Sequence, residues 1–259
     1  MTAAGSTTRP VIVTGSDSGI GRAIAVALAA AGHPVGVTWH TDQEGGEATA
    51  AEIRNAGGRA EVARLDLLDQ NSIGETVTGL ADRLGDLGGF VNNAGTGASA
   101  PFLEMELAEW QRVIDVDLTG AFLAAQAAAR RLTELGEGGR IVNITSIHEH
   151  LPLKGSSGYC AAKGGLGLLT KVMAVELPEH GITVNSVAPG EIATAMTGNE
   201  DVDPHTVDRP AIPLGRPGHA AEIAATVVHL MSPGAAYTNG ASIVVDGGLS
   251  LMGPVANQG

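Results

Sequence analysis

Seven short apolar segments recur along the chain, and most of them are separated by a stretch long enough to form a helix. They occupy residues 10–14, 34–39, 59–65, 88–92, 139–145, 182–187 and 241–245. Strands that alternate with helices pair in parallel, with helices covering both faces of the sheet. No low-complexity linker divides the 259 residues, so the pattern predicts one doubly wound α/β domain over residues 1–259. Ligands of such sheets bind at the carboxyl ends of the strands.

The first of these segments runs into a glycine-patterned turn. The apolar run 11–13 is followed by Gly15, Gly19 and Gly21, and then by the alanine-rich segment 23–31, which is typical of a helix. Without side chains in the turn, backbone amides and the positive N-terminus of the helix can approach a pyrophosphate closely. A tight turn with no ligand could carry the same glycines, and the position of this one after the first strand favours a nucleotide.

A tyrosine and a lysine are spaced for proton transfer. Tyr159 and Lys163 are four residues apart, so on a helix they project from one face. A free tyrosine has a pKa of about 10, whereas a cation nearby favours the phenolate and makes the group a usable acid or base. The alternative is a surface lysine beside a packed tyrosine, but with two tyrosines and three lysines in the chain the spacing rarely arises by chance.

These features and three others occur in an order that resembles the short-chain dehydrogenase/reductase family. The motifs are Thr14-Gly15-x-x-x-Gly19-x-Gly21, Asn92-Asn93-Ala94-Gly95, Ser146 before Tyr159-x-x-x-Lys163, Pro189-Gly190 with Thr194, and Val245-Asp246-Gly247-Gly248. The resemblance spans residues 9–250 and implies a Rossmann fold with a parallel sheet of about seven strands. The stretch 146–149 looks closest to the glucose 1-dehydrogenase and small-carbonyl reductase subgroup.

The resemblance implies an NAD(P)-dependent oxidoreductase of small alcohols and ketones. Tyr159 would act as acid in reduction and as base in oxidation, and Lys163 would hold the nicotinamide ribose and lower the pKa of the tyrosine. Ser146 would donate a hydrogen bond to the same substrate oxygen. A sugar 1-dehydrogenase is the alternative substrate class, and a catalytically weak, cofactor-binding regulator is a further alternative.

Position 117 departs from the family. The family usually carries asparagine in a Val-Asn-Leu-x-Gly segment, where its backbone carbonyl holds a water in the proton path from the lysine, and this chain has Asp117. Any residue supplies a carbonyl, so the water site can survive, but an ionised Asp117 would add a negative charge near Lys163. Asp117 is therefore a candidate relay residue; a helix residue with local hydrogen bonds is the alternative.

The residues after the second strand bear on the choice of cofactor. The acid expected for NAD is missing at Trp39, and His40 stands where related NADP enzymes often have arginine. With Thr41 and Ser16, His40 could receive the 2′-phosphate, so we expect NADP to be preferred over NAD. Two carboxylates would repel that phosphate: Asp17 and Asp42.

The resemblance implies further cofactor contacts. Asp66 looks like the family residue that contacts adenine. The full implied set is Gly15, Ser16, Ser18, Gly19, Ile20, Gly21, Trp39, His40, Thr41, Asp66, Leu67, Asn93, Ala94, Gly95, Tyr159, Lys163, Pro189, Gly190, Ile192 and Thr194.

Polar residues beside these motifs are candidates for the substrate pocket. His148 lies two residues after Ser146, so on an extended segment it would share the serine's side. Glu191 follows the proline-glycine pair, although a solvated loop acid explains it equally well. The polar, aperiodic segment 195–215 predicts a lid over the substrate. His148 and His150 have a chelating spacing, but no metal site is expected because they lack further ligands.

Composition limits the setting and the partners. The net charge of −13 argues against nucleic-acid binding. No apolar run is long enough to span a membrane and the N-terminus lacks a signal-peptide pattern. Cys160 is the single cysteine, which excludes an intrachain disulfide and fits a cytoplasmic protein. The family resemblance further implies a homotetramer, with a dimer as the second possibility.

Overall fold

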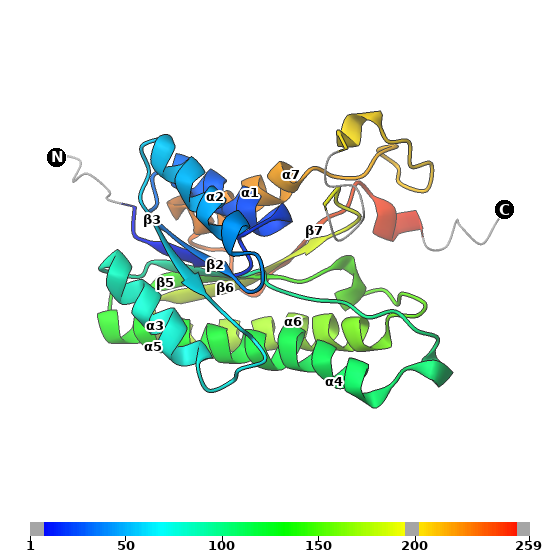
Figure 1. Cartoon of the computed structure of the whole chain (residues 1–259), viewed down its shortest axis with the longest axis horizontal. Coiled ribbons are helices and arrows are strands. Elements are labelled where there is room, and N and C mark those ends of the chain that lie inside the picture. Colours follow the sequence, from blue (N-terminus) through cyan, green and yellow to red (C-terminus); the bar gives the residue numbers. More distant parts are fainter. Residues whose placement is uncertain (1–7, 195–201, 253–259) are drawn as a thin grey trace.

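Each of the seven predicted segments overlaps a strand of one parallel sheet. The structure is a computed structural model, and it describes residues 8–194 and 202–252. The strands are β1 (Val11–Val13), β2 (Val35–Trp39), β3 (Ala60–Arg64), β4 (Gly89–Asn92), β5 (Gly139–Ile144), β6 (Ile182–Pro189) and β7 (Ser242–Val245). Their order is β3-β2-β1-β4-β5-β6-β7, so the chain starts at the centre, builds one edge and then returns to build the other. The predicted doubly wound Rossmann fold is confirmed (Figure 1).

Helices cover both faces of the sheet, as the alternation predicts. On one face lie α1 (Gly19–Ala30), α2 (Gln43–Asn55) and α7 (Ala220–Met231); on the other lie α3 (Ile73–Leu84), α4 (Leu107–Ile114), α5 (Ala121–Leu135) and α6 (Ser157–Glu176) (Figure 1). Helix α1 buries Ile24 and Leu28, four residues apart on one face, in the same cluster as Ile223 of α7. Leu80 of α3 and Leu132 of α5 belong to the cluster on the opposite face. Two separate apolar layers therefore hold the sheet rigid.

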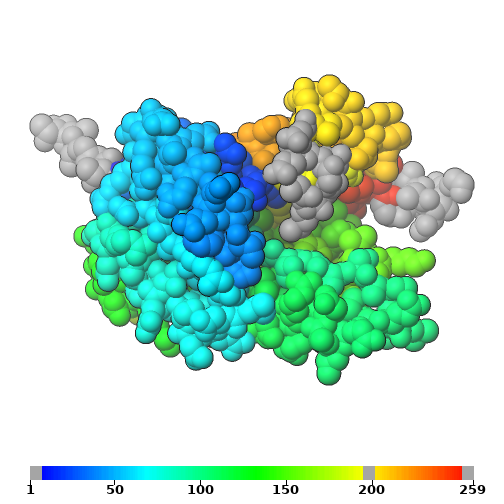
Figure 2. Space-filling model, viewed as in Figure 1, coloured from blue at the N-terminus to red at the C-terminus, as the bar shows by residue number. Residues whose placement is uncertain are grey.

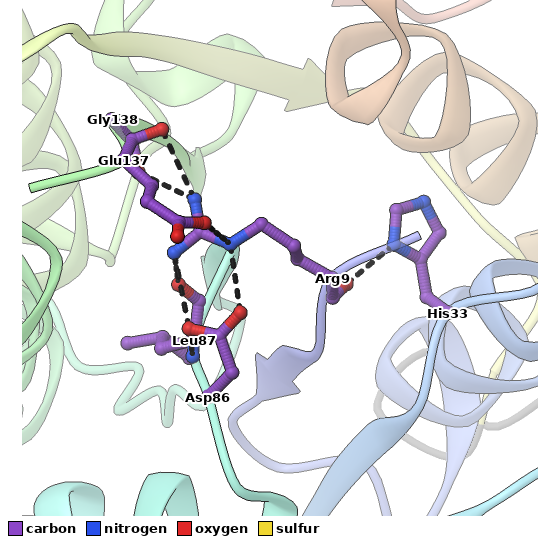
Figure 3. A network of polar contacts seen from close by, with 6 residues as sticks. All are labelled: Arg9, His33, Asp86, Leu87, Glu137 and Gly138. Atoms are coloured by element: carbon purple, nitrogen blue, oxygen red, sulfur yellow. Dashed lines mark hydrogen bonds and ion pairs between the residues drawn. The ribbon is translucent and has the colours of Figure 1, made fainter. Parts of the chain in front are cut away.

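A polar network fixes the edge of the sheet at which the strands begin (Figure 3). Arg9 precedes β1, and its Nε lies 2.9 Å from Asp86 Oδ2, while its Nη1 donates to the carbonyl of Gly138 at 3.0 Å. Its Nη2 donates to the carbonyl of Leu87, and its own carbonyl lies 2.8 Å from His33 Nδ1. Burial would raise the pKa of Asp86, but the hydrogen bonds from Arg9 and the Leu87 amide outweigh it and lower that pKa. The network joins segments before β1, β4 and β5 at the edge opposite the strands' carboxyl ends.

Helix α6 presents apolar side chains on two faces. Its inner face buries residues such as Leu166. Its outer face leaves Leu168, Val172 and Val175 exposed at 65%, 45% and 82%, a spacing of four and three residues along one stripe. Within the described ranges, no helix combines the length and the apolar character that crossing a membrane requires.

Candidate active site

A cleft of about 370 Å³ lies at the carboxyl ends of the strands and gathers most of the predicted site residues. In the space-filling view, the blue surface of the N-terminal segments borders the green surface of the middle of the chain near the centre of the molecule (Figure 2). The predicted residues that line the cleft are Gly15, Ser18, Gly19, Ile20, Gly21, Trp39, His40, Thr41, Asn93, Ala94, Gly95, Asp117, Ser146, Tyr159, Lys163, Pro189, Gly190, Ile192 and Thr194. Six lining residues were not in that predicted set: Asp17, Thr38, Leu65, Thr96, Ile144 and Thr145.

The glycine turn fits a pyrophosphate. Gly15 and Gly19 have φ angles of 59° and 53°, a left-handed conformation that other residues rarely adopt. A Cβ at Gly21 would lie 2.0 Å from the Gly15 carbonyl oxygen, so the turn closes tightly on itself. Ser18 caps α1 without a side-chain hydrogen bond, and the first turn carries no acid. The amides and positive end of α1 are therefore available to an anion in the cleft.

Parallel pairing brings an arginine to the end of β2. Trp39 of β2 is opposite Arg64 of β3, and the Arg64 Nε donates to the His40 carbonyl at 3.2 Å. Asp66 Oδ2 lies 3.2 Å from both His40 Nε2 and Arg64 Nη2. Burial would raise the pKa of Asp66, but the Leu68 amide, His40 and Arg64 outweigh it and lower that pKa. Sequence reasoning missed Arg64, which an in-register alignment of the second and third strands would have revealed.

Three predicted cofactor residues do not line the cleft: Ser16, Asp66 and Leu67. The Ser16 hydroxyl is fully buried, donates to the Val13 carbonyl at 2.8 Å and accepts from the Thr38 amide at 3.0 Å. Its backbone amide also donates to the Thr38 carbonyl, so the prediction that Ser16 receives a phosphate is wrong. Leu67 is buried in the core against Gly120, and it is Leu65 that lines the cleft. Leu65 and Leu67 both follow β3, and the sequence pattern alone did not show which of them faces the cleft.

Tyr159 and Lys163 share one face of α6, as their spacing predicts. The Lys163 Nζ lies 5.6 Å from the centre of the Tyr159 ring and donates to the Ile144 carbonyl at 3.4 Å. The Lys163 side chain is buried, with 5% of its surface exposed. Burial alone would lower the pKa of Lys163, but the negative charge of Asp117 beside it outweighs burial and raises that pKa. The lysine therefore stays an ammonium ion throughout the neutral range.

Ser146 lies two residues after the end of β5, and among the described residues its hydroxyl donates no hydrogen bond. It has an extended backbone, and its Oγ accepts from the His148 amide at 3.2 Å. The stretch Ile147–Glu149 is a turn of 3₁₀ helix, so the assumption that His148 follows on an extended segment is wrong. Its ring still meets the Tyr159 ring edge-on at 6.3 Å, and its Nδ1 lies 3.1 Å from the Leu151 carbonyl. His148 thus packs beside Tyr159 without lining the cleft.

Asp117 lies in a π-helical turn, Asp115–Gly120, that joins α4 to α5. Its side chain is fully buried, and Oδ2 lies 3.2 Å from the Lys163 Nζ. Its Oδ1 accepts from the Thr96 amide at 2.7 Å. The negative charge expected near Lys163 is thus in direct contact with the ammonium, and π-helical turns of this kind occur often at functional sites.

An ion pair joins the predicted substrate lid, residues 195–215, to the residues that follow β6. Glu191 does not line the cleft, and its Oε1 lies 2.7 Å from the Nε of Arg209. Residues 195–201 of the predicted lid lie outside the described residues. The described part, 202–215, contains a short 3₁₀ helix at Pro204–Thr206. Glu191 thus connects the end of β6 to this segment.

The second histidine and the cysteine make contacts outside the cleft. His150 Nε2 lies 2.7 Å from the Glu149 carboxylate, which is buried with 3% of its side chain exposed. Ser242 of β7 donates to the same carboxylate. The Cys160 thiol accepts from the Leu153 amide at 3.3 Å. Across residues 8–194 and 202–252, no group of three or more His, Cys, Asp or Glu side chains is arranged to hold a metal ion.

Comparison with known proteins places this geometry among dehydrogenases. A family model described as enoyl-(acyl carrier protein) reductase matches residues 15–250. The uncharacterized oxidoreductase YohF of Escherichia coli is 50% identical over 246 residues, covering 95% of this chain and 97% of that protein. Glucose 1-dehydrogenase 2 of Bacillus subtilis is 36% identical, covering 95% and 96%. The crystal structure of acetoin dehydrogenase YohF from Salmonella typhimurium is 49% identical with a TM-score of 0.88, covering 94% and 96% of the two chains.

Proposed function

The chain belongs to the short-chain dehydrogenase/reductase family and is an NAD(P)-dependent oxidoreductase, and from this premise we propose that it interconverts small ketones and alcohols, such as diketones and hydroxyketones. The observation that carries the proposal is that Ser146, Tyr159 and Lys163 line the same cleft as the open N-terminus of α1. One of the similar solved structures is that of an acetoin dehydrogenase, and acetoin is a small hydroxyketone. The loop at Thr96 adds few groups that could read the many hydroxyls of a sugar.

In the proposed reduction, the side chains orient the carbonyl and supply its proton. The glycine turn and Lys163 would hold a nicotinamide cofactor in the cleft, and that cofactor would supply the hydride and its two electrons to the carbonyl carbon. Ser146 donates a hydrogen bond to the carbonyl oxygen, where negative charge develops. The Tyr159 hydroxyl gives that oxygen its proton, becomes a phenolate beside the Lys163 ammonium, and regains a proton from solvent. Oxidation of the alcohol runs through the same steps in reverse.

A substrate panel tests the proposal. Purified protein would be titrated with NADPH and NADH by fluorescence, and then assayed with diacetyl, acetoin, simple ketones and glucose. We expect binding of a cofactor and the highest kcat/KM on a diketone or hydroxyketone. The highest activity on glucose would instead support a sugar dehydrogenase. The similarity to glucose 1-dehydrogenase 2 is the reason for including glucose in the panel. Cofactor binding without turnover of any carbonyl would favour a regulator.

We propose that NADP is preferred over NAD. Support comes from the basic groups at the end of β2, where His40 and Arg64 lie together and no acid stands at Trp39. Opposing charge comes from Asp17, which lines the cleft. Burial raises the pKa of Asp17, and the neighbouring Asp42 raises it further.

Arg64→Ala should weaken NADPH binding about tenfold and leave NADH binding unchanged, because only NADPH carries a phosphate for the guanidinium. Fluorescence titration with each cofactor at low and high salt measures the effect, which should shrink as salt rises. Arg59→Ala is the matched control. Arg59 lies before the amino end of β3, whereas Arg64 lies at its carboxyl end, and Arg59 donates to the Arg83 carbonyl. An equal loss of affinity for NADPH and NADH would show that Arg64 does not discriminate between the two cofactors.

We propose that the protein assembles as a homotetramer, with a dimer as the second possibility. The exposed stripe on α6, formed by Leu168, Val172 and Val175, supports self-association, because monomers rarely leave apolar residues in such a row. Light scattering of the purified protein tests the assembly. A monomer at micromolar concentration would contradict it.

A further inference from the structure

Two side chains lie beside Lys163, the ring of Tyr159 and the carboxylate of Asp117. Its ammonium lies 5.6 Å from the centre of the Tyr159 ring and 3.2 Å from Asp117 Oδ2. The side chains of Asp117 and Lys163 are 0% and 5% exposed, so water screens this ion pair little. A third acidic group, Glu149, also faces the lysine, but its carboxylate is engaged by His150 and Ser242.

We propose that Asp117 is a positioning residue that offsets part of the Lys163 charge and so keeps Tyr159 in its phenol form to a higher pH. The idea rests on the proposed function, because it concerns the proton that Tyr159 gives to the carbonyl. An ammonium alone would favour the phenolate, whereas a carboxylate in contact with that ammonium opposes it. The overall equilibrium of the reaction is unchanged. What changes is the pH range in which each direction is fast: reduction persists to higher pH, and oxidation needs more alkaline solution.

Asp117 also joins the lysine to the loop that follows β4. Its Oδ1 accepts from the Thr96 amide at 2.7 Å, and the Arg112 Nη1 of α4 donates to the Thr96 hydroxyl at 2.8 Å. A Cβ at Gly95 would lie 3.0 Å from Asp117 Oδ2 and 3.3 Å from the Lys163 Nζ. The pair is therefore packed against the backbone of the cleft wall. The carboxylate fixes the ammonium in place as well as offsetting its charge.

The variant Asp117→Asn separates these two roles. Asparagine retains an oxygen that can accept from the Thr96 amide and nearly the same volume, but it carries no charge. Asp115→Asn is the matched control, because Asp115 lies in the same π-helical turn, the substitution makes the same change of charge, and the Asp115 carboxylate accepts from the Gln111 side chain.

The test follows phenolate formation by ultraviolet absorbance, and it needs neither substrate nor turnover. The chain has two tyrosines, and the other, Tyr237, is fully exposed. In a Tyr237→Phe background every phenolate signal therefore belongs to Tyr159. We expect the midpoint of its ionisation to fall by about one pH unit in Asp117→Asn and to move by no more than about 0.2 units in Asp115→Asn.

An unchanged or raised midpoint in Asp117→Asn would overturn the proposal, whatever the substrate of the protein proves to be. If an alcohol is oxidised, the acid limb of kcat/KM for oxidation, where Tyr159 is still protonated, should shift by the same amount as the absorbance midpoint. Should Asp117→Asn fail to fold, Asp117→Ser removes the same charge while keeping an acceptor. Failure of both variants to fold would also overturn the proposal, in favour of a purely structural ion pair.

Discussion

Replacing Tyr159 by phenylalanine is expected to lower kcat by about 10²- to 10⁴-fold, the range over which a positioned acid or base contributes to catalysis. The ring that meets His148 edge-on and lies beside Lys163 remains, so packing is preserved. Only the hydroxyl that gives the proton is lost. The dissociation constant for NADPH should therefore stay within about threefold of the unaltered protein, a loss in kcat without a loss in binding.

Tyr237→Phe is the matched control for this substitution. It makes the same chemical change at the other tyrosine, which is fully exposed on the loop before β7, and it should leave kcat unaltered. Steady-state kinetics and fluorescence titration of both variants give the comparison. Nearly full activity in Tyr159→Phe would mean that another group donates the proton. If the variant shows no turnover but its biological function is unaltered, the regulator would be supported.

The fold was predictable because it depends on periodicity. Seven apolar segments separated by helical lengths permit few arrangements other than a parallel sheet covered on both faces, and each segment overlaps a strand. The glycine turn could also be predicted from the sequence. Gly15 and Gly19 adopt positive φ angles that other residues rarely adopt, so glycine is needed at both positions. The sequence also predicts that the strands leading to Asn92 and Ser146 end at one rim, because parallel strands end at the same edge, and the next residue Asn93 and Ser146 both line the cleft.

What the sequence did not reveal depends on pairing in three dimensions. Arg64 reaches His40 only because β3 pairs in register with β2, and no local pattern marks that contact. The inward turn of Ser16 depends on hydrogen bonds with β1 and β2 that compete with any ligand. The family resemblance predicted a negative charge from Asp117 near Lys163, but the direct contact depends on a π-helical turn that has no sequence signature.

Gly21→Ala is expected to abolish cofactor binding and to destabilise the protein, although the substitution adds a single methyl group. That methyl carbon would lie 2.0 Å from the Gly15 carbonyl oxygen and 2.5 Å from the Asn93 side-chain nitrogen. The carbonyl belongs to the backbone of a tight turn and cannot rotate away. Asn93 is itself fixed, because its amide donates to the carbonyls of Thr14 and Gly15 at 2.9 Å and 3.0 Å.

Relief of that clash has to come from moving the turn away from α1, and the displacement has two consequences. The free energy of unfolding should fall by about 3 kcal/mol, the upper part of the range for overpacking a filled site. The dissociation constant for NADPH should rise at least about 100-fold, because the amides at the start of α1 no longer face the phosphates. Thermal unfolding and fluorescence titration measure the two effects independently.

Gly74→Ala supplies the control that isolates the clash from the change of residue type. Gly74 is the second residue of α3, and a Cβ there meets no atom within 4 Å. Alanine suits a helix better than glycine by about 1 kcal/mol, so this variant should be slightly more stable and bind NADPH normally. If Gly21→Ala matched Gly74→Ala in stability and NADPH binding, the glycine turn would not be a rigid binding site for the phosphates. The N-terminus of α1 would then have to contact the nucleotide in another way.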